Sequence, residues 1–178
     1  MEKNLKNTRA LVEGGLLLAL SLLFDQFKAF ELPFGGSLTL QALPIIIYSV
    51  RWGLTRGMFL GFVFGVLSIF LGGYVIHPVQ GALDYPIAYM FLGLSALLVS
   101  RDKSYKSIAL SVVIAFACKV LSHVLSGFIF FKDTVPAGKN MALYMFEYNL
   151  SFTIPEVIVT LVVLAILMNT AKNRIFNV

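Results

Sequence analysis

The amino-acid sequence predicts an all-α integral membrane protein that forms a single bundle of six transmembrane helices. Hydrophobic residues make up 58% of the 178 residues, and charged residues only 13%. The mean hydropathy is strongly positive, at +0.86. One span takes about 20 apolar residues, so the chain has room for about six spans and for no separate soluble catalytic domain. We expect one domain over residues 1–178, with spans at about 8–29, 38–50, 53–72, 78–99, 105–130 and 142–170.

Residues that interrupt helices separate the first three spans. Residues 8–29 follow a basic N-terminus, but they contain Glu13 and lack a small-residue cleavage pattern, so we expect a retained span and not a signal peptide. Residues 38–50 form the shortest apolar run, after a proline and two glycines. Residues 53–72 begin at Gly53 and end at a glycine pair.

The last three spans are longer apolar runs. Residues 78–99 end at a charged stretch, and residues 105–130 end at a loop that contains proline and glycine. Residues 142–170 contain Pro155 followed by Glu156. A proline within a span frees a backbone carbonyl and often kinks the helix.

The distribution of cations predicts that both termini face the cytoplasm, because cytoplasmic loops are enriched in Lys and Arg. With six spans, ten cations lie on one side: Lys3, Lys6, Arg9, Arg51, Arg56, Arg101, Lys103, Lys106, Lys172 and Arg174. Lys28, Lys132 and Lys139 lie on the other side, and Lys119 lies within the fifth span. The net charge of +5 is thus explained by topology and indicates no nucleic-acid partner.

Polar residues from several spans are expected at one level near the outer face. At about 1.5 Å of rise per residue, Asp84 and Tyr85 lie about 10 Å inside the outer end of the fourth span. The inner third of the bundle is apolar, so the sequence predicts a pocket open to the outside and not a through-pore. The residues expected at this level are Tyr74, Asp84, Tyr85, His123, Gly127, Tyr144, Glu147, Tyr148 and Asn149.

These residue types favour a particular kind of ligand. A carboxylate within the membrane is costly and usually marks function. Together with aromatic faces, including Phe131, and neutral hydrogen-bonding groups, Asp84 suits a flat, partly cationic molecule. The alternative role for Asp84 is to neutralise Lys119, which we interpret as a structural counter-ion for Asp84, Glu147 or Glu156. Tyr148 is interpreted as part of the interfacial aromatic belt.

On these residues the chain resembles the thiamine-specific S components of energy-coupling factor transporters, the ThiT or YuaJ family. The resemblance covers nearly the whole chain. Its most specific stretches are FGGSLTL at residues 34–40, LP through RWGL at residues 43–54, ALDYP at residues 82–86, His123 with Gly127, and Tyr144 with Asn149.

The resemblance implies a membrane subunit that captures thiamine from outside and joins one transmembrane coupling subunit and two ATPase subunits. It implies no cofactor, since thiamine is the transported ligand. Carried over by position, the ligand-contacting residues are Tyr74, Asp84, Tyr85, His123, Gly127, Phe131, Tyr144 and Asn149. The loop from Pro33 to Ser37, which includes Phe34, Gly35 and Gly36, is implied to act as a lid.

Three positions depart from a known member of the family: Phe131 stands for a Trp, Asp84 for a Glu, and Thr39 for an acidic residue. In S components a small-xxx-small pattern on the first helix contacts the coupling subunit. Gly15 and Ala19 occupy that pattern here. Small residues allow close helix approach in lipid, so packing within the bundle is the alternative role.

Other function classes are disfavoured. The chain lacks a GxxxxGK[ST] phosphate-binding loop, an HExxH motif and paired acids at metal-ligand spacing, and its single Cys118 has no partner. We therefore expect no enzyme activity and no metal. A self-sufficient secondary transporter would show inverted repeats or polar residues through the full depth. The main alternative is an S component for another vitamin or precursor, such as hydroxymethylpyrimidine, riboflavin or biotin.

Overall fold

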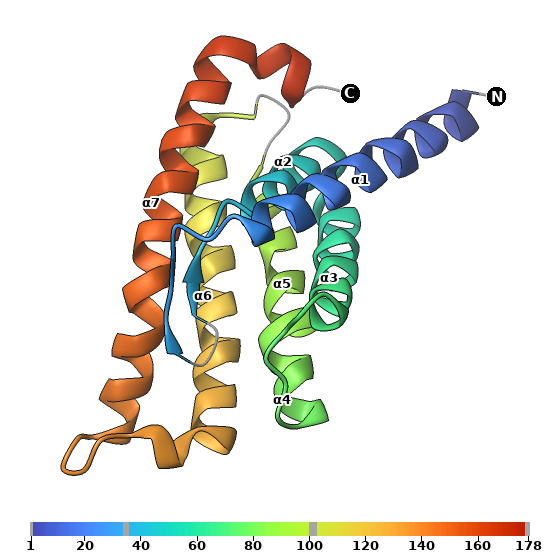
Figure 1. Ribbon diagram of the computed structural model, residues 1–178. Coiled ribbons are helices and arrows are strands. Elements are labelled where there is room, and N and C mark those ends of the chain that lie inside the picture. The colour runs from blue at the N-terminus through green and yellow to red at the C-terminus, as the bar shows by residue number, and fades with distance from the viewer. Residues whose placement is uncertain (1, 34–35, 100–102, 177–178) are drawn as a thin grey trace.

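The computed structural model describes residues 2–33, 36–99 and 103–176, and most of them are helical (Figure 1). The α-helices are α1 Glu2–Gln26, α2 Ala42–Trp52, α3 Leu54–Phe70, α4 Pro78–Ala82, α5 Ala88–Met90, α6 Tyr105–Phe130 and α7 Met141–Ile175. A π-helix, η2 Leu83–Ile87, and two 3-10 helices, η3 Phe91–Ala96 and η4 Lys132–Thr134, lie among them. Two short strands, β1 Phe30–Glu31 and β2 Ser37–Leu38, pair antiparallel. The predicted all-α fold is confirmed.

Three of the described helices are long and apolar enough to cross a membrane. They are α1 over Asn4–Gln26, α6 and α7. The helices α2 and α3 are apolar but shorter, with 11 and 17 residues. At about 1.5 Å per residue, α2 rises only about 16 Å, and its side chains are mostly buried among α1, α3, η3 and α7.

Several helices differ from the bounds that the sequence predicts, and two of the differences lie beside the site described below. The second apolar run was expected to be helical from residue 38, but Ser37 and Leu38 pair with β1, and α2 begins only at Ala42. The fourth run, residues 78–99, was expected to be one helix. Instead α4, η2, α5 and η3 follow one another and form the fourth helical segment. Pro86 lies within η2, where it has no backbone N–H to donate and favours a departure from regular α-helix.

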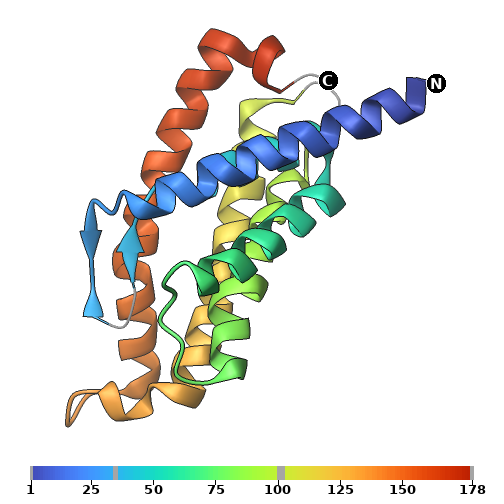
Figure 2. The same ribbon diagram turned by 45° about the vertical axis from the view of Figure 1, so that its right-hand side comes forward.

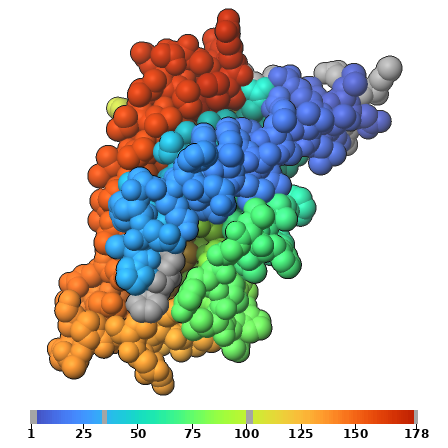
Figure 3. Space-filling model, viewed as in Figure 1, coloured from blue at the N-terminus to red at the C-terminus, as the bar shows by residue number. Residues whose placement is uncertain are grey.

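The helices form a bundle with α1 on its outside. α6 and α7 run side by side, and α3 lies along the fourth helical segment (Figures 1 and 2). α1 crosses the outer face of α2 and α3 in both views, and in Figure 3 it lies across the middle of the visible face, between α7 and α3. Much of its apolar surface is exposed, with Leu11 at 74% and Leu16 at 67%. Such a helix needs lipid or a partner protein to cover it.

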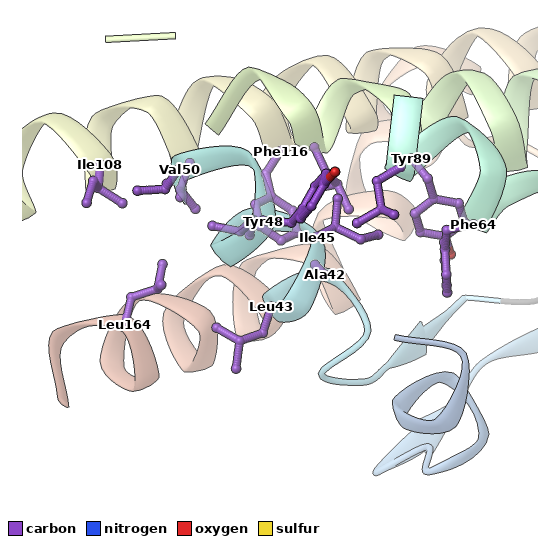
Figure 4. Close-up of a cluster of buried hydrophobic side chains, with 14 of the residues drawn as sticks. Ala42, Leu43, Ile45, Tyr48, Val50, Phe64, Tyr89, Ile108, Phe116 and Leu164 are labelled. Carbon is purple, nitrogen blue, oxygen red and sulfur yellow. The ribbon is translucent and has the colours of Figure 1, made fainter. Parts of the chain in front are cut away.

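The main hydrophobic core surrounds α2. Ala42, Leu43, Ile45, Tyr48 and Val50 of α2 meet side chains from four other elements, namely Phe64, Tyr89, Ile108, Phe116 and Leu164 (Figure 4). The ring of Phe64 meets that of Tyr89 edge-on, with centroids 4.7 Å apart. This contact connects α3 to the segment that carries the polar residues described below.

Two glycines of α3 allow it to approach the fourth helical segment closely. A Cβ atom on Gly61 would lie 2.2 Å from the backbone oxygen of Tyr89, and one on Gly65 would lie 2.5 Å from that of Tyr85. Glycine is therefore required at both positions. Close backbone approach of this kind replaces hydrophobic burial as the stabilising contact between helices in lipid. It also fixes where Tyr85 and Tyr89 lie.

The two chain ends lie at the same end of the bundle (Figures 1 and 2). A polar network at this end connects α1, α2 and α7. Glu13 accepts hydrogen bonds from Arg51 Nε at 2.6 Å and from Trp52 Nε1 at 2.8 Å. Arg51 also donates to the backbone oxygens of Arg174 and Ile175 at the C-terminal end of α7.

Lys103 extends this network from the loop before α6. Its ammonium donates to the backbone oxygen of Phe176. Burial lowers the pKa of Lys103, and the positive charge of Arg51 lowers it further. The carbonyl groups at the end of the last helix are thus stabilised by cations, which interact favourably with the C-terminal end of a helix dipole.

Candidate functional site

A cavity lies near the opposite end from the termini, between the β1–β2 hairpin, the fourth helical segment, α6 and α7. Its volume, open mouth included, is about 800 Å³. The lining residues are Gly36, Ser37, Gln41, Tyr74, Gln80, Asp84, Tyr85, Tyr89, Lys119, His123, Gly127, Phe131, Thr134, Tyr144, Met145, Tyr148, Asn149 and Phe152.

Three side chains hold the carboxylate of Asp84 on the cavity wall. Gln80 Nε2 donates to Oδ2 at 2.7 Å, and Ser126 Oγ donates to the same atom at 2.9 Å. His123 Nδ1 lies 3.1 Å from Oδ1. Gln80 is one helical turn before Asp84, and His123 and Ser126 are three residues apart on one face of α6. The Asp84 side chain remains 17% exposed, so it can still contact a ligand cation.

The π-helical turn η2 determines the direction of Asp84 and Tyr85. Ser122 Oγ of α6 donates to the backbone oxygen of Leu83 at 2.7 Å, which connects this turn to α6. The hydroxyl of Tyr85 accepts a hydrogen bond from the backbone N–H of Tyr74 at 2.6 Å. The two neighbouring side chains, Asp84 and Tyr85, both reach the cavity as a result.

Aromatic rings form another part of the wall. The rings of Tyr74 and Phe131 are 6.4 Å apart between centroids and inclined by 33°. The ring of Tyr144, in the first turn of α7, has the ammonium of Lys139 5.7 Å from its centroid. Aromatic faces of this kind attract flat and cationic molecules.

Asn149 and Gly127 lie where α6 and α7 approach each other. Asn149 is 5% exposed, and its Nδ2 donates to the backbone oxygen of Met145 at 2.9 Å. This bond uses the amide nitrogen of Asn149 and not its oxygen. A Cβ on Gly127 would lie 2.7 Å from the sulfur of Met145, so glycine keeps the two helices close.

The β1–β2 hairpin lies over the cavity and is bound to α7 by one tyrosine. The hydroxyl of Tyr148 accepts from the backbone N–H of Gly36 at 3.1 Å and donates to the backbone oxygen of Pro33. A Cβ on Gly36 would lie 2.8 Å from the Phe152 ring, so the hairpin rests directly on α7. Phe34 and Gly35, which were also predicted to belong to a lid, lie outside the described residues.

A second polar group lies at the inner end of the cavity. Lys119 and Glu156 form an ion pair at 2.8 Å, with side chains 3% and 1% exposed. The Lys119 ammonium also lies 5.3 Å from the centroid of the Tyr89 ring. Gln41 donates from Nε2 to the Tyr89 hydroxyl at 2.8 Å. In the described part of the chain, no group of three His, Cys, Asp or Glu side chains is arranged to hold a metal ion.

A sequence model of a known family, described as thiamine transporter protein (Thia_YuaJ), matches residues 11–176. This chain belongs to that family. The family is one of thiamine transporters and not of enzymes. Membership of this family indicates that the chain is a multi-pass membrane protein of bacteria.

Two relatives are similar over most of their length. The thiamine transporter ThiT of Bacillus subtilis (strain 168) is 30% identical over 174 residues, which cover 90% of this chain and 91% of that protein. The thiamine transporter ThiT of Lacticaseibacillus paracasei is 29% identical over 158 residues, or 81% and 76% of the two chains. A solved structure described as ThiT from Listeria monocytogenes has a TM-score of 0.86 at 20% identity and covers 97% of this chain and 100% of that one, which shows a shared fold.

The family resemblance assigns eight residues of this Thia_YuaJ member to the ligand. All eight line the cavity described above: Tyr74, Asp84, Tyr85, His123, Gly127, Phe131, Tyr144 and Asn149. Gly36 and Ser37 of the predicted lid line it as well. Gly15 and Ala19 lie elsewhere, on the exposed outer face of α1, and a Cβ on Gly15 would meet nothing within 4 Å.

Some residues have roles that differ from the predicted ones, and other lining residues, among them Gln80 and Gln41, were not predicted. Tyr148 was interpreted as part of an aromatic belt, but it lines the cavity and holds the hairpin. Lys119 was left with three possible acidic partners, and Glu156 is the one it contacts. Glu147, predicted at the same level, is exposed and is not among the lining residues.

Gln80 lies four residues before Asp84, and this spacing was the available signal that its side chain holds the Asp84 carboxylate. Gln41 had no comparable signal, because its contact with Tyr89 spans 48 positions.

Proposed function

We propose that this protein is the substrate-capturing S component of an ATP-driven energy-coupling factor importer, and that its ligand is thiamine. The observation that carries the proposal is that the eight residues assigned to the ligand by family resemblance line a single cavity. Membership of the thiamine transporter family supports the choice of ligand.

The chemistry of the cavity suits thiamine. Thiamine contains a cationic thiazolium ring, an aminopyrimidine ring and a hydroxyl group. Asp84 supplies a negative charge, and Tyr74, Phe131 and Tyr144 supply aromatic faces, each worth about 0.5 to 2 kcal/mol to a cation. Asn149 and His123 supply hydrogen-bonding groups for the heteroatoms of the pyrimidine.

The direction of capture follows from the topology that the cations predict. Lining residues of the cavity lie on α4, η4 and the first turns of α7, and these elements lie at the opposite end of the bundle from the two termini (Figure 1). With both termini in the cytoplasm, the cavity opens toward the outside, and the hairpin held by Tyr148 closes over the ligand after entry.

Isothermal titration of the detergent-purified protein with thiamine tests the ligand. We expect saturable binding with one thiamine per chain, and no heat from hydroxymethylpyrimidine, riboflavin or biotin at equal concentrations. Absence of heat at tens of micromolar thiamine would exclude it as the ligand. Tighter binding of one of the other compounds would assign an S component of that specificity instead.

We further propose that the exposed face of α1 contacts the transmembrane coupling subunit, which carries two ATPase subunits. Gly15 and Ala19 lie four residues apart on this face, where small side chains allow close helix approach. The variant Gly15→Leu is expected to lose co-purification with the coupling module and to keep thiamine binding. Ala142→Leu, at an exposed alanine of α7, serves as the matched control. Unchanged co-purification of Gly15→Leu would place the contact elsewhere.

A further inference from the structure

Gln41 has a buried polar side chain that does not cap the helix which follows it. It occupies the position just before α2, where a polar side chain commonly caps the free N–H groups of the helix, but its side chain makes no such capping bond. Instead Gln41 is 3% exposed, lines the cavity, and donates to the Tyr89 hydroxyl.

The amide oxygen of Gln41 has no hydrogen-bond partner among the described residues. Burial of an acceptor without a partner is costly, and a partner that enters from the cavity would remove this cost. Gln41 lines the cavity that we propose to hold thiamine, and a hydrogen-bond donor of the ligand can fill this role.

Gln41 lies deeper in the cavity than the Asp84 carboxylate and the side chains that hold it. Its partner Tyr89 is five residues beyond Asp84 along the fourth helical segment, which is about 7 Å of rise. Lys119, whose ammonium lies over the Tyr89 ring, is one turn below His123 on α6. The cavity therefore has an outer level with the Asp84 carboxylate and an inner level with neutral or paired groups.

We infer that Gln41 is a specificity-determining residue of this cavity, and that its amide oxygen accepts a hydrogen bond from an uncharged donor of the ligand, a hydroxyl or an amino group. The inference rests on the proposed function and deepens it. The cationic ring of the ligand lies at the outer level near Asp84, and an uncharged polar end lies at the inner level.

Isothermal titration of Gln41→Met tests this role, because methionine has a similar length and no hydrogen-bonding amide. Three ligands are compared: thiamine, an analogue whose hydroxyl is replaced by hydrogen, and an analogue whose amino group is replaced by hydrogen. We expect Gln41→Met to lower the affinity for thiamine about tenfold, and the loss to disappear for the analogue that lacks the donor bound by Gln41.

Thr160→Val is the matched control. Thr160 is also buried, its hydroxyl also lacks a partner among the described residues, and it is not among the lining residues of the cavity. Its thiamine affinity is expected to match that of the wild type. Where Gln41→Met does not fold, the double variant Gln41→Met/Tyr89→Phe removes both hydrogen-bonding partners at once and carries the same expectation.

The outcomes separate the inference from the proposed function. If the wild type binds thiamine and Gln41→Met binds it equally well, the inference is wrong and the proposed function stands. An equal loss for all three ligands would mean that Gln41 acts through packing alone, which also overturns the inference. A wild type that binds no thiamine would overturn both.

Discussion

The imidazole Nδ1 of His123 lies 3.1 Å from Oδ1 of Asp84, although 39 positions separate the two residues in the chain. The contact joins α6 to the π-helical turn of the fourth helical segment. It orients the carboxylate on the cavity wall, together with the hydrogen bonds from Gln80 and Ser126. A carboxylate held in this way needs little rearrangement to meet a cation, which favours affinity.

Asp84→Asn is expected to lower thiamine affinity by about tenfold to hundredfold, because a charged hydrogen-bonding partner is worth about 1.5 to 3 kcal/mol. Asparagine keeps the size of the side chain, so the melting temperature should change little. Isothermal titration measures the affinity. Asp133→Asn, at an exposed position in η4, is the control and should bind as the wild type does. Equal affinities for both variants would remove Asp84 from the ligand contacts.

Tyr148→Phe is expected to speed the release of thiamine about fivefold, because it removes the hydroxyl that binds the hairpin at Gly36 and Pro33. Release is followed by chase of radiolabelled thiamine from the purified protein. Tyr105→Phe is the matched control, since the Tyr105 hydroxyl also bonds a backbone oxygen, that of Leu161, outside the cavity. An unchanged release rate in Tyr148→Phe would show that this hydroxyl does not hold the hairpin closed.

Glu156→Gln is expected to destabilise the protein by about 3 to 5 kcal/mol, because it leaves the buried ammonium of Lys119 without an opposite charge. Thermal unfolding in detergent measures the loss. Glu31→Gln removes one partner of an exposed ion pair with Lys28 and should shift the melting temperature far less.

A second variant separates charge from packing at the same pair. Lys119→Met/Glu156→Met removes both charges and should recover much of the stability that Glu156→Gln loses. A double variant as unstable as the single one would mean that packing, and not the unpaired charge, causes the loss.

Glu13→Ala is expected to shift the fluorescence emission of Trp52 to longer wavelength. Glu13 accepts from the indole N–H of Trp52 and from Arg51, and its removal opens the junction of α1 and α2 to water. Trp52 is the single tryptophan, so the spectrum reports on this junction alone. Glu147→Ala, at an exposed glutamate of α7, should leave the spectrum unchanged. An unshifted spectrum in Glu13→Ala would mean that the junction stays closed without this carboxylate.

The sequence predicted the fold class and most of the cavity wall. Apolar runs reveal helices directly, because each span needs a length of apolar residues that no soluble element requires. Depth along the helices then placed Asp84, His123 and Asn149 at a common level. This reasoning works because helix rise is regular, and it needs no knowledge of which helices are neighbours.

Local backbone geometry and long-range contacts could not be predicted in the same way. The start of α2 was placed too early, since hydropathy does not distinguish a short strand such as β2 from the first turn of a helix. The roles of Gln41 and Tyr148 depend on contacts across 48 and 112 positions. Pairings of that range arise from tertiary packing, which periodicity along one chain does not encode.

The widened turn between Leu83 and Ile87 makes chain length at this point as important as residue identity. Deleting one residue there would let the backbone close into an ordinary α-helix, and Asp84 and Tyr85 would lose the wider turn that directs them to the cavity. The direction of Asp84 toward His123 would change even where the deleted residue is Leu83, Pro86 or Ile87, which do not line the cavity. Functional members of this lineage should therefore tolerate substitutions in the turn far more readily than insertions or deletions.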